Sequence, residues 1–187
     1  MSIYLASKSP RRQELLKQIG IKFICLNAEI DESPIAGEEP IRYVQRMATE
    51  KANAGWNHPQ RCEQRTLIAA DTSVVLDGII MGKPVSNVQA RIMLENLSEK
   101  THQVITSVAI TDGFKADEIT NITNVTFCKL PTELIEYYVG SGECADKAGA
   151  YAIQGFAARF VKFISGSYSG VVGLPLYETS QLLQKFK

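Results

Sequence analysis

The first twelve residues place two hydroxyl groups and two guanidinium groups beside an expected helix start. These side chains are Ser7, Ser9, Arg11 and Arg12, in the string LASKSPRRQELL. Ser9 is a favourable helix N-cap, and Pro10 suits the first helical position. A cation in the first helical turn is disfavoured by roughly 0.3–1 kcal/mol unless an anion lies nearby. We therefore interpret the segment as a phosphate cradle, with an exposed basic turn or a phosphorylation site as the alternatives.

A second candidate is an acid inside an apolar strand. Asp71 interrupts the run LIAADTSVVL, which otherwise has the composition of an interior strand. A buried carboxylate without a partner would cost several kcal/mol, so Asp71 must have one. A structural aspartate bonded to backbone amides or to an arginine is one interpretation. Catalysis is the other, because lysines and a further acid lie at the ends of neighbouring elements.

Three charged residues could join Asp71. Lys51 lies near the end of a helix predicted over residues 38–53, Lys83 is held in the turn GKP, and Glu32 follows an expected strand. Each is also compatible with an ordinary solvent-exposed position. Cations that converge on a triphosphate would each contribute about 4 kcal/mol at ~4 Å and an effective dielectric of about 20, before desolvation. The residues alone thus indicate phosphate hydrolysis.

The same strings resemble a known family along almost the whole chain. After LASKSPRRQELL come ATEKA, AADT, GKP, THQVIT, DKAGAYAIQG and VVGLPL, in that order. This series is similar to the signature of the Maf family of nucleoside triphosphate pyrophosphatases. The resemblance implies hydrolysis between the α and β phosphates, which yields a monophosphate and pyrophosphate.

The resemblance also implies a role for most of the candidate residues. Asp71 would be the catalytic acid that orients or deprotonates water, and together with Glu32 it would hold a divalent metal. Oxygen ligands and phosphate suit Mg²⁺ or Mn²⁺ better than zinc. The expected phosphate-binding residues are Ser7, Ser9, Arg12, Lys51 and Lys83.

Three further positions match one branch of the family. Arg11, Thr72 and Gln154 agree with the dTTP/UTP pyrophosphatases, whereas the sibling branch that acts on 7-methyl-GTP has tryptophan, glutamine and glutamate there. A neutral amide can pair with the edge of uracil or thymine, and an aromatic residue with an acid suits a cationic purine. We expect dTTP, UTP and 5-modified relatives as substrates, since one methyl group changes affinity by only about 1–3 kcal/mol.

Strand and helix patterns alternate without an internal repeat. Strands are predicted at residues 3–5, 67–76, 79–81, 104–110, 125–128 and 159–164, and helices from Ser9 to Gly20 and over 38–53, 86–97, 132–139 and from Pro175. Short hairpins force some antiparallel pairing, so the class is α/β with a mixed sheet. The resemblance implies a Maf/ITPase-like fold, with a twisted sheet flanked by helices and two small lobes around a central cleft. We expect one domain over residues 1–187.

Composition excludes several other classes of protein. The chain has 187 residues, of which 45% are hydrophobic and 21% charged, and its 20 basic residues balance 20 acidic ones. It therefore lacks the basic surface of a nucleic-acid-binding protein, and no run reaches the ~20 apolar residues of a membrane helix. Four widely spaced cysteines and two histidines do not form a zinc pattern. We expect a cytoplasmic protein that binds neither nucleic acid nor membrane.

Some alternatives stay open at this stage. The family is associated with arrest of septum formation, so a noncatalytic nucleotide-binding regulator is one, and a 7-methyl-GTP pyrophosphatase is another. A homodimer fits the resemblance. His102 is interpreted as structural, although an occasional acid role is the alternative.

Overall fold

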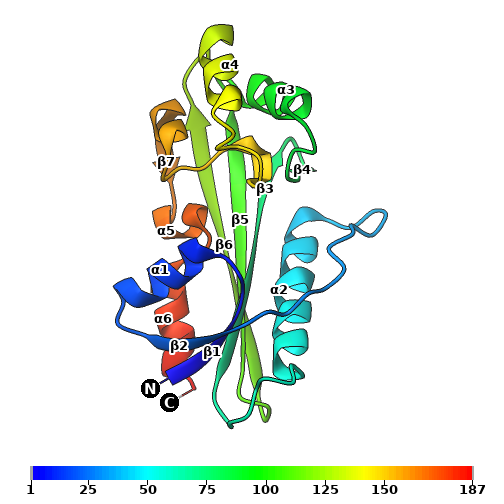
Figure 1. The fold of residues 1–187 in the computed structure, drawn as a ribbon, viewed down its shortest axis with the longest axis vertical. Coiled ribbons are helices and arrows are strands. Elements are labelled where there is room, and N and C mark those ends of the chain that lie inside the picture. The colour runs from blue at the N-terminus through cyan, green and yellow to red at the C-terminus, as the bar shows by residue number, and fades with distance from the viewer. Residues whose placement is uncertain (1, 187) are drawn as a thin grey trace.

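The centre of the molecule is a long mixed sheet. The computed structural model describes residues 2–186, which form a seven-stranded sheet in the order β2-β1-β3-β5-β6-β7, with β4 paired to β3. Three antiparallel strands, β3 (Leu67–Leu76), β5 (Thr101–Thr111) and β6 (Ala116–Phe127), run along its length (Figure 1). Their length allows them to carry helices at both ends of the molecule.

Shorter strands extend this sheet at its edges. β1 (Ser2–Ala6) is parallel to β2 (Lys22–Leu26) and to β3, whereas β4 (Ile79–Met81) and β7 (Val161–Ser165) pair antiparallel with β3 and β6. This combination confirms the predicted mixed α/β sheet.

The helices gather in two groups, which correspond to the two expected lobes. Helices α1, α2 and α6 lie with β1 and β2 at the end that holds both termini, which we call the proximal lobe (Figure 1). Helices α3 and α4, strand β7 and the 3-10 helices η1 and η2 form the distal lobe. The helices are α1 (Pro10–Gln18), α2 (Pro40–Trp56), α3 (Asn87–Leu97), α4 (Thr132–Gly140), η1 (Ala148–Ala150), η2 (Phe156–Phe160), α5 (Tyr168–Val172) and α6 (Leu176–Gln184).

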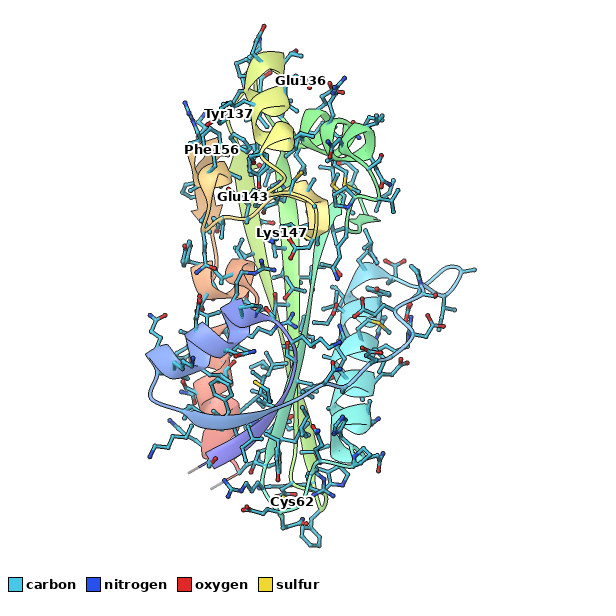
Figure 2. All side chains as sticks on the ribbon, in the orientation of Figure 1. Cys62, Glu136, Tyr137, Glu143, Lys147 and Phe156 are labelled. Carbon is cyan, nitrogen blue, oxygen red and sulfur yellow. The ribbon has the colours of Figure 1, made fainter. Side chains whose placement is uncertain are left out.

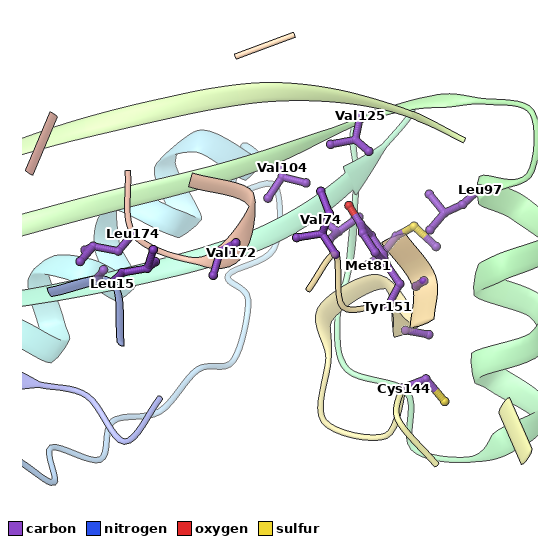
Figure 3. Close-up of a cluster of buried hydrophobic side chains, with 14 of the residues drawn as sticks. Leu15, Val74, Met81, Leu97, Val104, Val125, Cys144, Tyr151, Val172 and Leu174 are labelled. Carbon is purple, nitrogen blue, oxygen red and sulfur yellow. The ribbon is translucent and has the colours of Figure 1, made fainter. Parts of the chain in front are cut away.

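One hydrophobic cluster continues from one lobe into the other. Figure 3 shows Leu15 and Leu174 on the proximal side, Val172 between the lobes, and Val74 with Tyr151 on the distal side. These side chains are 6% exposed or less. The two groups of helices therefore pack on a shared core rather than on separate ones.

Strand β3 has an open edge between the lobes. Along β3, β1 pairs only with Leu67 and Ile68, and β4 pairs only with residues 74–76. Residues 69–73 of β3 therefore have a strand partner on the β5 side alone. Successive side chains of a strand point to opposite faces. Where a strand has partners on both edges, the sheet separates the side chains of its two faces. At residues 69–73 one edge of β3 has no partner, so side chains from both faces can line the same cavity at that edge.

Several element boundaries differ from the sequence prediction because tertiary packing decides them. β6 begins at Ala116, nine residues before the predicted start, although this segment is polar. It pairs with β5 at every position from Thr101↔Thr126 to Thr111↔Ala116. The hydrogen-bonded partner, rather than the residue pattern, sets its length.

Helix α2 also continues past the predicted end, through Gly55 to Trp56. A Cβ at Gly55 would lie 2.6 Å from Cβ of Ala6, so glycine allows the helix to lie directly on β1. The predicted strand at residues 159–164 begins only at Val161, after η2, and helix α5 was not anticipated. Within residues 2–186, no helix has the length and apolar character needed to cross a bilayer.

Candidate active site

A cleft of about 890 Å³ opens where the two lobes meet the unpaired edge of β3. Its walls include residues of the α1 start, α2, the loop before α2, β3, the GKP turn and the loop around η1. All ten residues singled out from the sequence line it: Ser7, Ser9, Arg11, Arg12, Glu32, Lys51, Asp71, Thr72, Lys83 and Gln154. The structure thus brings the whole candidate set together, and the role of each stays a prediction.

Lys51 joins the two candidate carboxylates. Its Nζ lies 2.7 Å from Oδ1 of Asp71 and 2.5 Å from Oε1 of Glu32. Asp71 is 8% exposed on β3, whereas the Glu32 side chain is 48% exposed on a loop. The partner that the buried Asp71 required is therefore a lysine from the facing helix, twenty residues earlier in the chain.

The charges around Glu32 favour its ionised form. Burial raises the pKa of Glu32, but the hydrogen bond and charge of Lys51, with the charges of Lys83 and Arg12, outweigh this effect and hold the pKa below its usual value. Cations from the start of α1, from α2 and from the GKP turn thus act on one point of the cleft. Such a concentration of positive charge is suited to a polyphosphate.

Tyr43 is a cleft residue that sequence reasoning missed. Its hydroxyl donates to the backbone oxygen of Glu32 over 2.8 Å and so ties the loop to α2. Burial, together with the negative charges of Asp71 and Glu32, raises the pKa of Tyr43 to about 12. The phenol is therefore protonated at neutral pH. Its helical spacing of eight residues from Lys51 was the available signal.

Arg12 links three segments of the chain. It donates from Nε to the Gly173 oxygen over 2.8 Å, from Nη2 to Thr72 Oγ1 over 3.1 Å and from Nη1 to Ser7 Oγ over 3.4 Å. Burial lowers the pKa of Arg12, and the charge of Asp71 opposes this effect. A guanidinium pKa starts so high that the group stays charged. Arg12 is thus a fixed cation whose fork geometry a lysine could not reproduce.

The α1 start offers further donors. Ser9 is the N-cap residue as predicted, yet its side chain makes no capping bond, and its backbone N–H donates to Ser7 Oγ over 3.2 Å. The helix therefore does not use the Ser9 hydroxyl for its own stability. By contrast, the predicted cap at Ser86 accepts from the Gln89 N–H over 3.2 Å.

Thr72 reaches the cleft on the other face of β3. Its Oγ1 lies 3.0 Å from Oγ1 of Thr106, a fully buried residue of β5 that also donates to the Gly170 oxygen over 2.8 Å. Asp71 and Thr72 are neighbours on a strand and so face opposite ways. Both serve one cleft because β3 has no partner on this side at their positions.

The distal wall of the cleft carries Gln154 and a lysine that the sequence interpretation did not assign. Lys147 lines the cleft beside its ion-pair partner Asp146, and the charge of Arg11 helps to lower the pKa of Asp146 after the larger effect of Lys147. The Gly149 N–H donates to the Gly82 oxygen over 3.1 Å, which fixes this loop against the GKP turn. The sequence signal that could have indicated Lys147 is its place within the motif DKAGAY.

Comparison with known proteins identifies the family. The model of the family described as Maf-like protein matches residues 2–186. The chain belongs to the Maf family. It is 53% identical over 184 residues to a dTTP/UTP pyrophosphatase of Pseudoalteromonas atlantica (strain T6c / ATCC BAA-1087), covering 98% of this chain and 96% of that protein. It is 52% identical to a dTTP/UTP pyrophosphatase of Chromobacterium violaceum, covering 98% and 94%.

Among solved structures, this Maf protein resembles the Staphylococcus aureus Ham1 protein, with a TM-score of 0.47 and 15% identity, over 68% of this chain and 72% of that one.

His102 packs behind the cleft rather than in it. It is 2% exposed, its Nε2 lies 2.8 Å from the Tyr151 hydroxyl, and its Nδ1 has no partner among the described residues. Rings of Phe127 and Tyr151 meet it edge to face at 4.9 and 5.4 Å. These contacts agree with the structural interpretation of His102.

Burial of His102 predicts a loss of stability in mild acid. Burial lowers the pKa of His102 to about 4 from an ordinary 6.5. Between these two pH values His102 is protonated in the unfolded chain but neutral in the folded chain. The free energy of unfolding should therefore fall by up to about 3 kcal/mol as the pH drops from 6.5 to 4. Urea unfolding across this range should show a shallower pH dependence in His102→Gln. His58→Gln, at the other histidine, is the control, and an unchanged slope in His102→Gln would contradict the prediction.

Proposed function

We propose that this Maf protein hydrolyses dTTP and UTP between the α and β phosphates and releases the nucleoside monophosphate and pyrophosphate. The observation that carries the proposal is the Lys51–Asp71 pair at 2.7 Å inside a cleft that also receives Arg12 and Lys83. Relatives that are about half identical along nearly the whole chain bear the name dTTP/UTP pyrophosphatase. The site therefore supports phosphate hydrolysis, and the names of the relatives support dTTP and UTP as the substrates.

We assign to Asp71 the activation of the attacking water. Its carboxylate orients or deprotonates this water, and Lys51 fixes the carboxylate through the hydrogen bond to Oδ1. The cations have a different task, because charge accumulates on the departing pyrophosphate. Arg12, Lys51 and Lys83 stabilise that charge as a preorganised set, and Ser7 and Ser9 add hydroxyl donors.

We also propose Mg²⁺ or Mn²⁺ as the cofactor, held by Asp71 and Glu32. Residues 2–186 contain no group of three or more histidine, cysteine or acidic side chains that could hold a metal by themselves. Two carboxylates nevertheless suit Mg²⁺, which commonly binds one or two acids together with substrate phosphates. Asp71 and Glu32 would hold the metal, while Lys51 contacts Oδ1 of Asp71 and Oε1 of Glu32. The metal, when bound, neutralises phosphate charge.

We assign recognition of the pyrimidine base to Arg11, Thr72 and Gln154. All three line the cleft, and Gln154 lies on its distal wall, whereas Thr72 lies on β3. A side-chain amide offers both a donor and an acceptor, which matches the N–H and carbonyl edge of uracil and thymine. Modified pyrimidines with a substituent at carbon 5 are accepted on the same basis.

A substrate panel with product identification tests this proposal. Purified protein should release pyrophosphate from dTTP and UTP in the presence of Mg²⁺, with CTP and 7-methyl-GTP turned over at least about tenfold more slowly. Orthophosphate as the product would contradict the choice of bond. Preference for 7-methyl-GTP would move the protein to the sibling branch. Nucleotide binding without turnover at any metal concentration would favour a noncatalytic regulator.

The cellular setting is part of the proposal. Cys25, Cys62, Cys128 and Cys144 are all free thiols, and the first two are exposed, as is usual in a reducing compartment. We therefore assign the protein to the cytoplasm. A homodimer stays a prediction that rests on the family resemblance.

A further inference from the structure

The cleft segment that carries Gln154 has no regular secondary structure to hold it. Residues 151–154 line the cleft between η1 and η2, with only a turn hydrogen bond from the Gly155 N–H to the Ala152 oxygen, 3.1 Å, within the segment. Gln154 itself is exposed. Its amide can be placed reproducibly only if groups outside the segment fix the backbone on either side.

Tyr138 fixes the beginning of this segment. The residue lies on α4 and is 0% exposed, and its hydroxyl accepts a hydrogen bond from the Ala152 N–H over 3.2 Å. Before it, the Tyr151 hydroxyl lies 2.8 Å from His102 Nε2. The beginning of the segment is therefore held by the hydroxyl groups of two buried tyrosines, Tyr138 and Tyr151.

Glu143 fixes the other end and connects it to the first. Its Oε2 accepts from the Phe156 N–H over 3.2 Å, and its Oε1 accepts from the Tyr138 hydroxyl over 3.3 Å. A Cβ placed on Gly155 would lie 2.0 Å from Oε1 of Glu143, so the backbone lies directly against the carboxylate. Figure 2 shows Glu143 between Phe156 and Lys147.

These contacts form one hydrogen-bonded chain from Ala152 through Tyr138 and Glu143 to Phe156. Neither Tyr138 nor Glu143 lines the cleft, so they act only through the segment that they hold. We propose that Tyr138 and Glu143 are positioning residues for base recognition, because they hold the backbone on both sides of Gln154. This inference rests on the proposed function, in which Gln154 contacts the pyrimidine.

The chemistry explains why position matters for selectivity. Uracil presents an N–H and a carbonyl, whereas cytosine presents a ring nitrogen and an amino group. A glutamine amide can satisfy either pattern if it turns over, since it has one donor end and one acceptor end. A fixed backbone sets the distance and the direction from which the amide meets the base, and loss of this placement weakens the pairing that favours uracil. Loosening the segment should therefore reduce discrimination between UTP and CTP more than it reduces turnover.

Two variants test the inference through KM and kcat for UTP and CTP. Tyr138→Phe and Glu143→Ala should each lower the UTP/CTP ratio of kcat/KM about tenfold, mainly through a higher KM for UTP, as expected for loss of a bond worth about one neutral hydrogen bond or more. Glu143→Gln should retain most of the ratio, because an amide oxygen can still accept from the Phe156 N–H. Rescue by glutamine would separate geometry from charge.

Matched controls lie beside these residues. Tyr137→Phe removes a hydroxyl from the next residue of α4, whose side chain is 67% exposed and whose ring lies 5.2 Å from that of Phe156. It should leave the ratio unchanged. Inhibition by inorganic pyrophosphate reports on the phosphate site and should change less than about twofold in all variants, and thermal unfolding shows whether they fold.

The outcomes separate this inference from the proposed function. An unchanged UTP/CTP ratio in folded Tyr138→Phe and Glu143→Ala would overturn the positioning role, even with wild-type hydrolysis of dTTP and UTP. An equal loss of pyrophosphate binding would overturn it too, because the whole cleft would then be affected. If the wild type instead prefers 7-methyl-GTP and the same variants weaken that preference, the proposed function fails and the positioning role holds.

Discussion

Asp71→Asn should lower kcat for dTTP by a factor of about 10²–10⁴ while the protein remains folded. An amide cannot take a proton from water, and it cannot hold a metal as a carboxylate does. It can still accept from Lys51, whose Nζ lies 2.7 Å from Oδ1 in the native protein and keeps Glu32 as a second partner. Steady-state release of pyrophosphate measures the effect, and thermal unfolding should shift by only a few degrees.

Asp77→Asn is the matched control for this variant. Asp77 is exposed in the turn after the same strand, outside the cleft, and its φ of 51° is one that asparagine readily adopts. It should have wild-type kcat and stability. A kcat of Asp71→Asn within about threefold of wild type would remove Asp71 from the chemical step, since loss of general-base catalysis has a far larger effect.

Lys51→Met should impair both activity and stability. The substitution keeps an unbranched side chain of similar length but leaves Asp71, at 8% exposure, without its cation, and leaves Glu32 facing it. Removal of one partner of a buried pair costs about 3 kcal/mol, which corresponds to a fall in Tm of about 6–12 °C for a protein of this size. We expect kcat/KM to fall by a factor of about 10²–10³, as for loss of a preorganised donor.

The pH dependence of this penalty identifies its cause. In the wild type, burial opposes ionisation of Glu32, but Lys51 and the other cations hold its pKa below 4.5. Its stabilising contribution is therefore present above pH 4.5 and is lost as the pH falls through the lowered value. The stability difference between wild type and Lys51→Met should shrink below pH 4.5. Lys100→Met, at a half-exposed lysine 3.9 Å from Asp77, is the control, and a pH-independent difference would point to lost packing instead.

Much of the local structure followed from short-range signals. The N-caps at Ser9 and Ser86, the turn at Asp77 and Gly78 and the limits of β3 all agree with the sequence prediction. Each depends on residues a few positions apart, whose conformational preferences act in any context. Short-range signals did not predict the full length of the polar strand β6 or the continuation of α2 through Gly55. Both depend on partners that lie elsewhere in the chain.

The site divides in the same way. Sequence reasoning named ten cleft residues, yet it did not show that Lys51 lies between two acids or that Arg12 contacts Gly173, 161 residues later. It also did not identify Thr106, which contacts Thr72 from behind the cleft, or Glu143, which accepts a hydrogen bond from the Phe156 N–H. A residue that holds another in place carries no chemistry that its type and spacing could reveal.

The amino-acid sequence by itself determined which charged and hydroxyl groups are available, where helices start and turns form, and which family the chain resembles. Only the tertiary structure decided that β3 has an open edge at residues 69–73, so that Asp71 and Thr72, on opposite faces, serve one cleft. The physical reason is that strand pairing and helix packing are set by surfaces brought together from distant parts of the chain. Their energies depend on the assembled core rather than on any one segment.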